Sequence, residues 1–261
     1  MTEESGVRLR REGQVPVVVI DRPDAANALS LAVLDGIEAA LAELESEPAC
    51  RCVVVSGGGV RVFSAGGDIA QMRDLPKADG PAFVARGQEV LQRLASSRLI
   101  SIAALNGHAL GGGAELALAC DLRVGAEEAT FGFPEVGVGL IPGWGGTQRA
   151  LRLAGPAGAK LAILTGRRLP MTEAFRLRLV DVVVPREQVL AAAIALASEI
   201  AALSPSAVVA SKRSIDAGAD LSLKEGLAAE AAAWLENFAT EDRVEGLTAF
   251  LERRPPRWTG T

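Results

Sequence analysis

The sequence contains few of the residues that bind metal ions. Among its 261 residues are three cysteines and one histidine, His108, whereas a zinc site needs four thiolate or imidazole ligands at short spacing. We therefore expect no metal site, and no mechanism that uses two histidines. We interpret His108 as a loop side chain that bonds to the backbone, and Cys50 and Cys52 as reduced thiols in the core.

Segments for export, membrane insertion or nucleic-acid binding are also missing. The N-terminal segment MTEESGVRLRREG has no apolar stretch like that of a signal peptide, and no apolar run approaches the length that crosses a bilayer. A net charge of −5 with dispersed arginines argues against nucleic acids and anionic membranes as partners. We expect a cytoplasmic globular protein, because a hydrophobic content of 49% is ample for a packed core.

Nucleotide-binding motifs are absent as well, although two glycine-rich loops precede helical patterns. There is no GxxxxGK[ST], and the glycines of residues 57–59 lack GxGxxG order, so nucleotide hydrolysis and hydride transfer have little support. The order strand, glycine loop, helix repeats along the chain. This repeat predicts a largely parallel, layered α/β core whose two glycine loops face one pocket beyond the carboxyl ends of the strands.

Hydrophobic patterns locate the expected elements. Ser30 is placed to cap the N-terminus of a helix, and residues 206–252 alternate apolar and charged residues at helical spacing, which predicts a C-terminal helical appendage. Its apolar residues fit either a core or a subunit interface. We expect strands at residues 7–11, 15–20, 52–55, 101–105, 122–124 and 182–184, and helices at residues 31–44, 81–95, 156–164, 171–177 and from about 186 onward.

The stretch 106–121, NGHALGGGAELALACD, holds the first candidate for chemistry. Three glycines at residues 111–113 leave backbone N–H groups free just ahead of a short buried helix, so Glu115 falls in its first turn. Such amides suit a carbonyl oxygen that gains negative charge during a reaction. Taken alone, however, a first-turn glutamate is more often a partner of the helix dipole, and GGG is more often a flexible loop.

Two other segments supply a second set of amides and a second carboxylate. The loop SGGGVRVFSAGGDI also precedes a helical pattern, which predicts free amides around residues 65–68. Glu135 follows Pro134 in an irregular segment. Because residues 136–141 are all apolar or glycine, we expect Glu135 to be buried with a raised pKa, rather than exposed in a turn.

Five ordered motifs make the chain resemble the crotonase superfamily, the enoyl-CoA hydratase/isomerase family, from about residue 15 to the C-terminus. The motifs are RPDAANAL (22–29), FSAGGDI (63–69), NGHALGGGAELALACD (106–121), FGFPEVGVGLIPGWGGTQR (131–149) and FATEDRVEGLTAFLERR (238–254). The resemblance implies an α/β fold with a crotonase-like ββα superhelix core at residues 1–203. It also implies a C-terminal helical oligomerisation appendage at residues 204–261, which would form a homotrimer or a dimer of trimers.

The resemblance also implies a role for individual residues. The backbone N–H groups of Gly67 and Gly112 would form an oxyanion hole, and Glu115 and Glu135 correspond to the two catalytic glutamates of hydratases. No separate cofactor is implied, since coenzyme A is part of the substrate. The implied substrate contacts are Ala25, Ala26, Ala65, Asp68, Ile69, Ala70, Gly143 and Trp144, with Arg253 and Arg254 as further coenzyme A contacts.

The implied reaction adds water to a 2-enoyl-CoA thioester and gives a 3-hydroxyacyl-CoA. Glu115 would activate the water and Glu135 would protonate Cα, while the two amides hold the enolate-like oxygen. A 3,2-enoyl-CoA isomerase, another acyl-CoA enzyme of the superfamily and a non-catalytic acyl-CoA-binding scaffold remain alternatives. The presence of both glutamates favours hydration, because isomerisation needs one carboxylate and no water.

Three residues depart from the pattern of the family. Asp24 stands where a basic residue is common, Phe133 where glutamine is frequent, and Trp144 where small residues are frequent. These differences predict other contacts for the coenzyme phosphates and an acyl pocket that is smaller or differently shaped.

Overall fold

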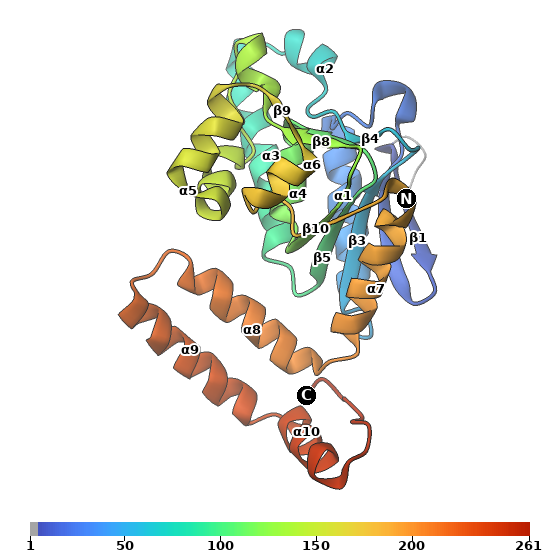
Figure 1. The fold of residues 1–261 in the computed structure, drawn as a ribbon, viewed down its shortest axis with the longest axis vertical. Helices are drawn as coiled ribbons and strands as arrows, with labels where there is room; N and C mark the ends of the chain where they lie inside the picture. The colour runs from blue at the N-terminus through green and yellow to red at the C-terminus, as the bar shows by residue number, and fades with distance from the viewer. Residues whose placement is uncertain (1–4) are drawn as a thin grey trace. The chain divides into compact units, whose positions relative to one another are not determined.

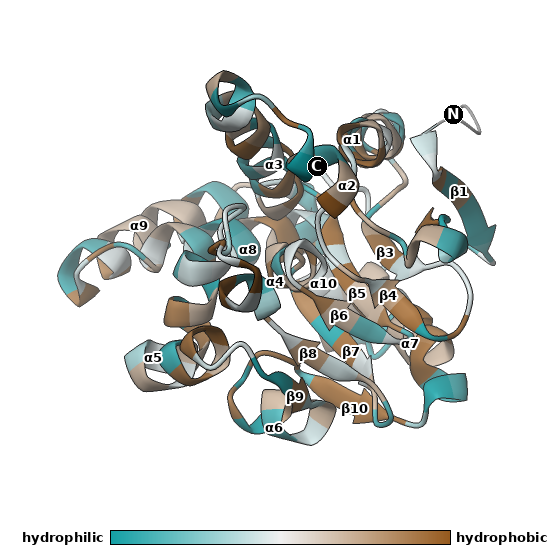
Figure 2. Ribbon diagram, turned by 90° about the horizontal axis from the view of Figure 1, so that it is seen from above, coloured by the Kyte–Doolittle hydropathy of each residue, from teal (hydrophilic) through white to brown (hydrophobic). Residues whose placement is uncertain are grey.

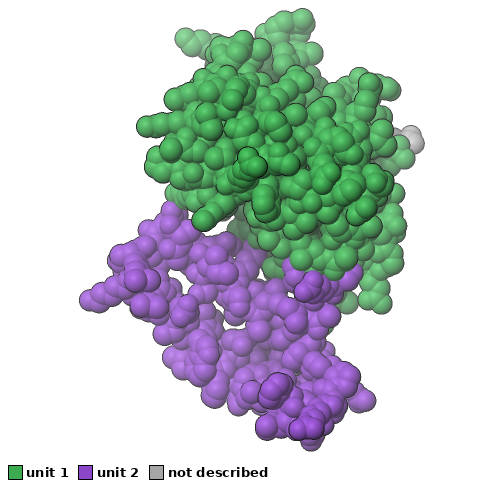
Figure 3. All heavy atoms as spheres, in the orientation of Figure 1, with its two compact units in different colours: residues 1–197 green, residues 198–261 purple. Residues whose placement is uncertain are grey.

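The structure, a computed structural model, describes residues 5–261. These residues form two compact units, of which the first ends at Ala197 and the second spans Ser198–Thr261 (Figure 3). The first four residues of the N-terminal segment lie outside the described residues. The boundary predicted between residues 203 and 204 falls in the link between helix α7 (Val189–Ala201) and helix α8 (Pro205–Gly218).

A six-stranded sheet forms the centre of the first unit (Figure 1). Its strands, in spatial order, are β1 (Val7–Glu12), β2 (Val15–Ile20), β3 (Cys52–Gly57), β5 (Ile100–Leu105), β7 (Leu122–Ala126) and β10 (Val182–Val184). The predicted hairpin is confirmed, because β1 and β2 are antiparallel, and all other neighbours are parallel. Every residue of β3 and β5 is buried, as expected for parallel strands covered on both faces. The edge strand β1 is hydrophilic by comparison (Figure 2).

A second sheet consists of strands only three residues long. In spatial order they are β4 (Val62–Ser64), β6 (His108–Leu110), β8 (Thr130–Gly132) and β9 (Arg168–Pro170). The residue pattern alone predicted no strand in these segments, since three residues are too few to show a strand period. Strands β4, β6 and β8 each follow a strand of the large sheet and precede a helix. This repeat of two strands and a helix confirms the ββα core that the resemblance implied.

The helices of the first unit connect consecutive strands, except the last, which follows β10. They are α1 (Leu31–Glu45), α2 (Ile69–Arg73), α3 (Gly80–Ala95), α4 (Gly112–Ala119), α5 (Gly146–Leu164), α6 (Met171–Arg176) and α7. The Ser30 hydroxyl caps α1 by accepting a hydrogen bond from the Val33 N–H, as predicted. The helix expected at residues 156–164 is only the second half of α5. A kink at Gly155, where φ is 68°, separates the halves, so the second half begins at Pro156, as predicted.

The second unit consists of α8, α9 (Leu223–Phe238) and α10 (Glu241–Glu252), which confirms the predicted helical appendage. Helices α8 and α9 pack against each other, yet neither buries a single residue in the isolated chain. The buried Asp242 of α10 holds the segment that follows, because its carboxylate accepts hydrogen bonds from the N–H groups of Thr259 and Gly260. Among residues 5–261 no single helix has the length and apolar composition to cross a membrane, and one bent pair, residues 186–201 with α8, meets both criteria only jointly.

Candidate active site

Helix α4 places Glu115 in the core of the first unit. All eight residues of the helix are buried, and Glu115, in the first turn, is only 2% exposed. Its Oε1 atom accepts hydrogen bonds of 2.7 Å from the N–H groups of both Trp144 and Gly146. Burial raises the pKa of Glu115 above its ordinary value, and the hydrogen bonds from these amides oppose that rise. The carboxyl is thus fixed in orientation by the backbone of a distant loop.

Glu135 lies in a single turn of 3-10 helix, η4 (Pro134–Val138), and its side chain is half-buried. Burial raises the pKa of Glu135 to about 7, and the negative charge of Glu115 adds to the rise. The raised pKa and its cause, burial, were predicted, although the sequence neighbours Val138, Leu140 and Ile141 are themselves exposed. The carboxyl instead lies against the loop before α4.

That loop brings Glu135 close to the start of α4. A Cβ atom built on Gly111 would lie 3.0 Å from Glu135 Oε1. The other carboxyl oxygen, Oε2, is buried and has no hydrogen-bond partner within residues 5–261. An unpaired buried carboxyl oxygen is costly in a folded protein and is typical of sites that bind a ligand or a proton.

The two predicted amide donors lie beside each other. A Cβ atom built on Gly112 would lie 3.1 Å from the Gly67 nitrogen, so the two glycine loops are in contact. The Leu29 N–H bonds to the Gly66 carbonyl, and the Asp68 N–H bonds to the Leu29 carbonyl, which holds Gly67 between them. Within residues 5–261, neither the Gly67 N–H nor the Gly112 N–H donates a hydrogen bond. Two adjacent free amides form a site for an oxygen that carries negative charge.

Trp144 closes this group of residues on one side. Trp144, which stands where small residues are frequent in the family, is 4% exposed. Its ring centroid lies 5.4 Å from that of Phe83. A Cβ atom on Gly112 would lie 2.7 Å from Trp144 Cζ3, and one on Gly67 would lie 3.5 Å from Cη2. The structure therefore brings together Glu115, the Gly67 and Gly112 amides and Trp144, with Glu135 at the adjoining loop.

The other predicted substrate contacts surround the Gly67 loop. Ala65 N–H bonds to the Ala26 carbonyl, which links two of the predicted segments. Asp68 has a structural role, because its carboxylate caps α2 at the Gln71 N–H and pairs with Arg22 at 3.2 Å. Four of the predicted contacts are exposed, namely Ala25, Ala65, Ile69 and Ala70, and Ala26 is half-buried. The carbonyl of Gly143 accepts a hydrogen bond from the Gln88 side chain.

Three residues at the site were not predicted from the sequence. Met72 lies beside Gly67, since its Cε is 3.2 Å from the position of a Cβ on that glycine. Phe83 and Gly87 on α3 contact the Trp144 indole. Nothing in the sequence around them marks a site, because an apolar residue on an amphipathic helix looks the same wherever its buried face packs.

The predicted coenzyme contacts Arg253 and Arg254 lie in the second unit. The Arg254 guanidinium is engaged there by Glu245, at 2.7 Å and 2.9 Å, and by Glu252 at 2.7 Å. These pairs hold the pKa of Glu245 at about 2. A role of Arg253 and Arg254 in binding coenzyme A stays a prediction.

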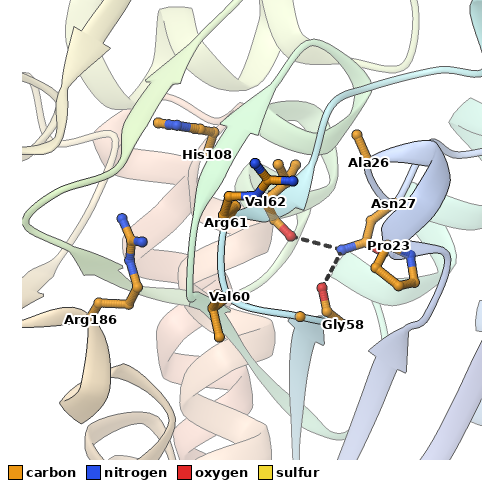
Figure 4. A pocket seen from close by; sticks show the side chains of 10 residues that line it. Pro23, Ala26, Asn27, Gly58, Val60, Arg61, Val62, His108 and Arg186 are labelled. Atoms are coloured by element: carbon orange, nitrogen blue, oxygen red, sulfur yellow. Dashed lines mark hydrogen bonds between the residues drawn. The ribbon is translucent and has the colours of Figure 1, made fainter.

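A pocket of about 570 Å³ lies beside the loop that carries Ala26 (Figure 4). It is lined by Pro23, Ala26, Asn27, Gly58, Gly59, Val60, Arg61, Val62, His108 and Arg186. The Asn27 amide bonds to the carbonyls of Gly58 and Val62 and so shapes one wall. Of the predicted site residues only Ala26 lines it, and neither glutamate does. This pocket is therefore distinct from the residues that could carry out chemistry.

His108 lines the same pocket from strand β6, whereas the sequence predicted a loop position. Its Nδ1 accepts a hydrogen bond of 3.1 Å from the Thr130 N–H, so the expected bond to the backbone is confirmed. Burial lowers the pKa of His108, and the nearby Arg168 and Arg186 lower it further.

Comparison with known proteins gives consistent results over nearly the whole chain. A sequence profile described as Enoyl-CoA hydratase/isomerase matches residues 10–261. The chain is 40% identical over 252 residues to the short-chain-enoyl-CoA hydratase of Clostridium acetobutylicum, with 97% of both proteins covered. It is 41% identical over 246 residues to the crotonyl-CoA hydratase of Syntrophomonas wolfei, with 94% of this chain and 95% of that protein covered. The crystal structure of an enoyl-CoA hydratase from Bacillus anthracis superimposes with a TM-score of 0.94 at 37% identity, covering 98% of this chain and 100% of that one.

Proposed function

Because the chain belongs to the enoyl-CoA hydratase/isomerase family, we propose that it adds water across the 2,3 double bond of a 2-enoyl-CoA and forms a 3-hydroxyacyl-CoA. One observation carries this proposal beyond the family. Two carboxyl groups with raised pKa values, Glu115 and Glu135, adjoin the two free amides of Gly67 and Gly112.

The amides act on the thioester carbonyl. When water adds to the conjugated double bond, the thioester oxygen becomes enolate-like and gains negative charge. Two N–H groups that are already fixed in place by the backbone stabilise this charge without rearrangement. Each such donor contributes a factor of about 10² to 10³ in rate. The donors are backbone groups, so the identity of the side chain at residue 67 takes no part in this contact.

The glutamates move the protons. Glu115 holds the water and takes its proton, since the Trp144 and Gly146 amides keep its carboxylate in place. Glu135 supplies the proton to Cα, and a pKa of about 7 leaves much of it protonated at neutral pH. Two carboxyl groups that act on one water titrate together, so their apparent pKa values describe the pair rather than either residue alone.

Crotonyl-CoA tests this proposal directly. Addition of the protein should remove the absorbance of the conjugated enoyl thioester, with 3-hydroxybutyryl-CoA as the product by chromatography. An isomerase would instead create that absorbance from a 3-enoyl-CoA. A protein that binds acyl-CoA but changes neither substrate at any chain length would be a scaffold, and the hydratase proposal would fail.

We also propose that the second unit assembles the protein into a homotrimer or a dimer of trimers. In the single chain α8 and α9 bury no residue, and α9 exposes Leu223, Leu227 and Trp234. Apolar surface of this extent on helices is typical of subunit interfaces. Sedimentation equilibrium would report the mass, and a monomer at micromolar concentration would contradict the proposal. The proposed cytosolic location is tested by fractionating cells that express the natural protein.

A further inference from the structure

We propose that Trp144 is the specificity-determining residue of this site and limits the acyl group to short chains such as crotonyl. The proposal rests on the hydratase function, because it assumes that the thioester oxygen binds the Gly67 and Gly112 amides. It concerns the side chain of Trp144, whereas the backbone N–H of the same residue holds Glu115.

The six-membered ring of the indole lies directly beside both amide donors. A Cβ atom on Gly112 would meet Cζ3 at 2.7 Å and Cε3 at 2.9 Å, and one on Gly67 would meet Cη2 at 3.5 Å. An acyl group whose oxygen accepts hydrogen bonds from these two amides therefore starts in contact with the ring. Carbons beyond Cβ of the acyl chain have to pass it.

The ring is held in place from behind. A Cβ atom on Gly87 would overlap Trp144 Nε1, so the indole is seated directly against the backbone of α3. Phe83, one turn earlier on the same helix, packs against it with a ring angle of 43°. Only 4% of the residue is exposed, and its close packing against α3 opposes displacement of the ring.

Met72 also lies beside Gly67, and its side chain is more adaptable than the indole. Met72 Cε and Sδ lie 3.2 Å and 3.6 Å from the position of a Cβ on Gly67, and a methionine side chain adapts its shape easily. Met72 can accommodate small differences in a short acyl group, whereas Trp144 sets the maximum length. A small residue at position 144 would leave this space open for a longer acyl chain.

Truncating the side chain separates the two roles of the residue. In Trp144→Ala the backbone N–H that bonds to Glu115 remains, so a comparison of two substrates within this variant reports on the side chain. Misfit of a single methylene in an apolar pocket changes kcat/KM about 10-fold to 200-fold. We therefore expect the ratio of kcat/KM for 2-decenoyl-CoA to that for crotonyl-CoA to rise at least about 10-fold in Trp144→Ala, and less in Trp144→Phe.

Phe175→Ala is the matched control, because it removes a half-exposed aromatic side chain from α6 in the same unit and leaves the site intact. Its ratio should equal that of the parent protein. Should the alanine variant fail to fold, the Trp144→Phe variant still tests the direction of the shift. An unchanged ratio in folded, active Trp144 variants would overturn the proposal, as would a parent protein that hydrates both substrates equally well.

Calorimetric binding of butyryl-CoA and decanoyl-CoA separates this proposal from the hydratase function, because it needs no turnover. We expect the parent protein to prefer butyryl-CoA, and Trp144→Ala to shift the ratio of Kd values toward decanoyl-CoA by at least about 10-fold. If this shift occurs without hydration, the limit on chain length stands and the hydratase function fails. If hydration occurs and the Kd ratio does not shift, the hydratase function stands and Trp144 does not set the length.

Discussion

The two units of the chain differ in what their apolar side chains do. In the first unit such side chains fill β3, β5 and α4, every residue of which is buried. In the second unit α8 and α9 bury nothing in the single chain, although both contain several alanines and α9 also contains leucines. The first unit therefore forms a buried core in the single chain, whereas the second exposes apolar surface that we propose a partner subunit covers. Chemistry and assembly are expected to respond to different substitutions.

The largest expected effect breaks the chemistry of the first unit alone. Glu115→Gln and Glu135→Gln should each lower kcat for crotonyl-CoA hydration by about 10² or more, since a general acid or base contributes about 10² to 10⁴. Sedimentation should be unchanged, because neither residue belongs to the second unit. Stopped-flow absorbance measures the rate. Variants that turn over like the parent protein would remove both glutamates from the mechanism.

A smaller expected effect concerns the free energy of unfolding, which the buried carboxyl of Glu135 lowers when it is ionised. The pKa of Glu135 is raised from 4.5 to about 7 in the folded protein, so unfolding becomes easier as pH rises through this window. Glu135→Gln lacks this penalty and should exceed the parent protein in unfolding free energy by up to about 3 kcal/mol above pH 7. The difference should vanish below pH 4.5. Urea unfolding at several pH values measures it, and a constant difference would contradict the assigned cause.

The smallest expected effect concerns the second unit. Trp234, 58% exposed and stacked on Phe238, is the largest apolar side chain that α9 offers a partner. Trp234→Ala should weaken self-association by about 2 kcal/mol, which is roughly 30-fold in the dissociation constant. The fold of each subunit should persist, since the removed side chain is not part of a core. Sedimentation across a dilution series measures the change, and circular dichroism provides the control. Unaltered association would place the contact surface elsewhere.

Much of the first unit was predictable from local patterns. Continuous apolar runs gave β3 and β5, and Ser30 marked the start of α1, because buried parallel strands and capped helices have strong local signatures. The second sheet escaped prediction from the residues, since β4, β6 and β8 are too short to show a period. Their pairing is decided by tertiary contacts.

The candidate site divides in the same way. Glu115 could be found because glycines precede a helix locally, and Glu135 because of its position after a proline. The amides that hold Glu115 come from a loop 29 and 31 residues further along the chain, which no local pattern reveals. The surroundings of Glu135 were hidden for the same reason, because its carboxyl lies near Gly111, which is distant from it in sequence.

The hydrogen bonds to Glu115 come from the main-chain N–H groups of residues 144 and 146. These two positions nevertheless differ in the substitutions that they tolerate. Substitutions at position 144 other than proline keep the N–H that binds the base, so a library of such variants would sample substrate range while this hydrogen bond is retained. Position 146 has no such latitude, because a methyl group on Gly146 would lie 2.9 Å from the Oε1 atom that its own N–H binds. Substrate range and proton transfer can thus diverge independently within three consecutive residues.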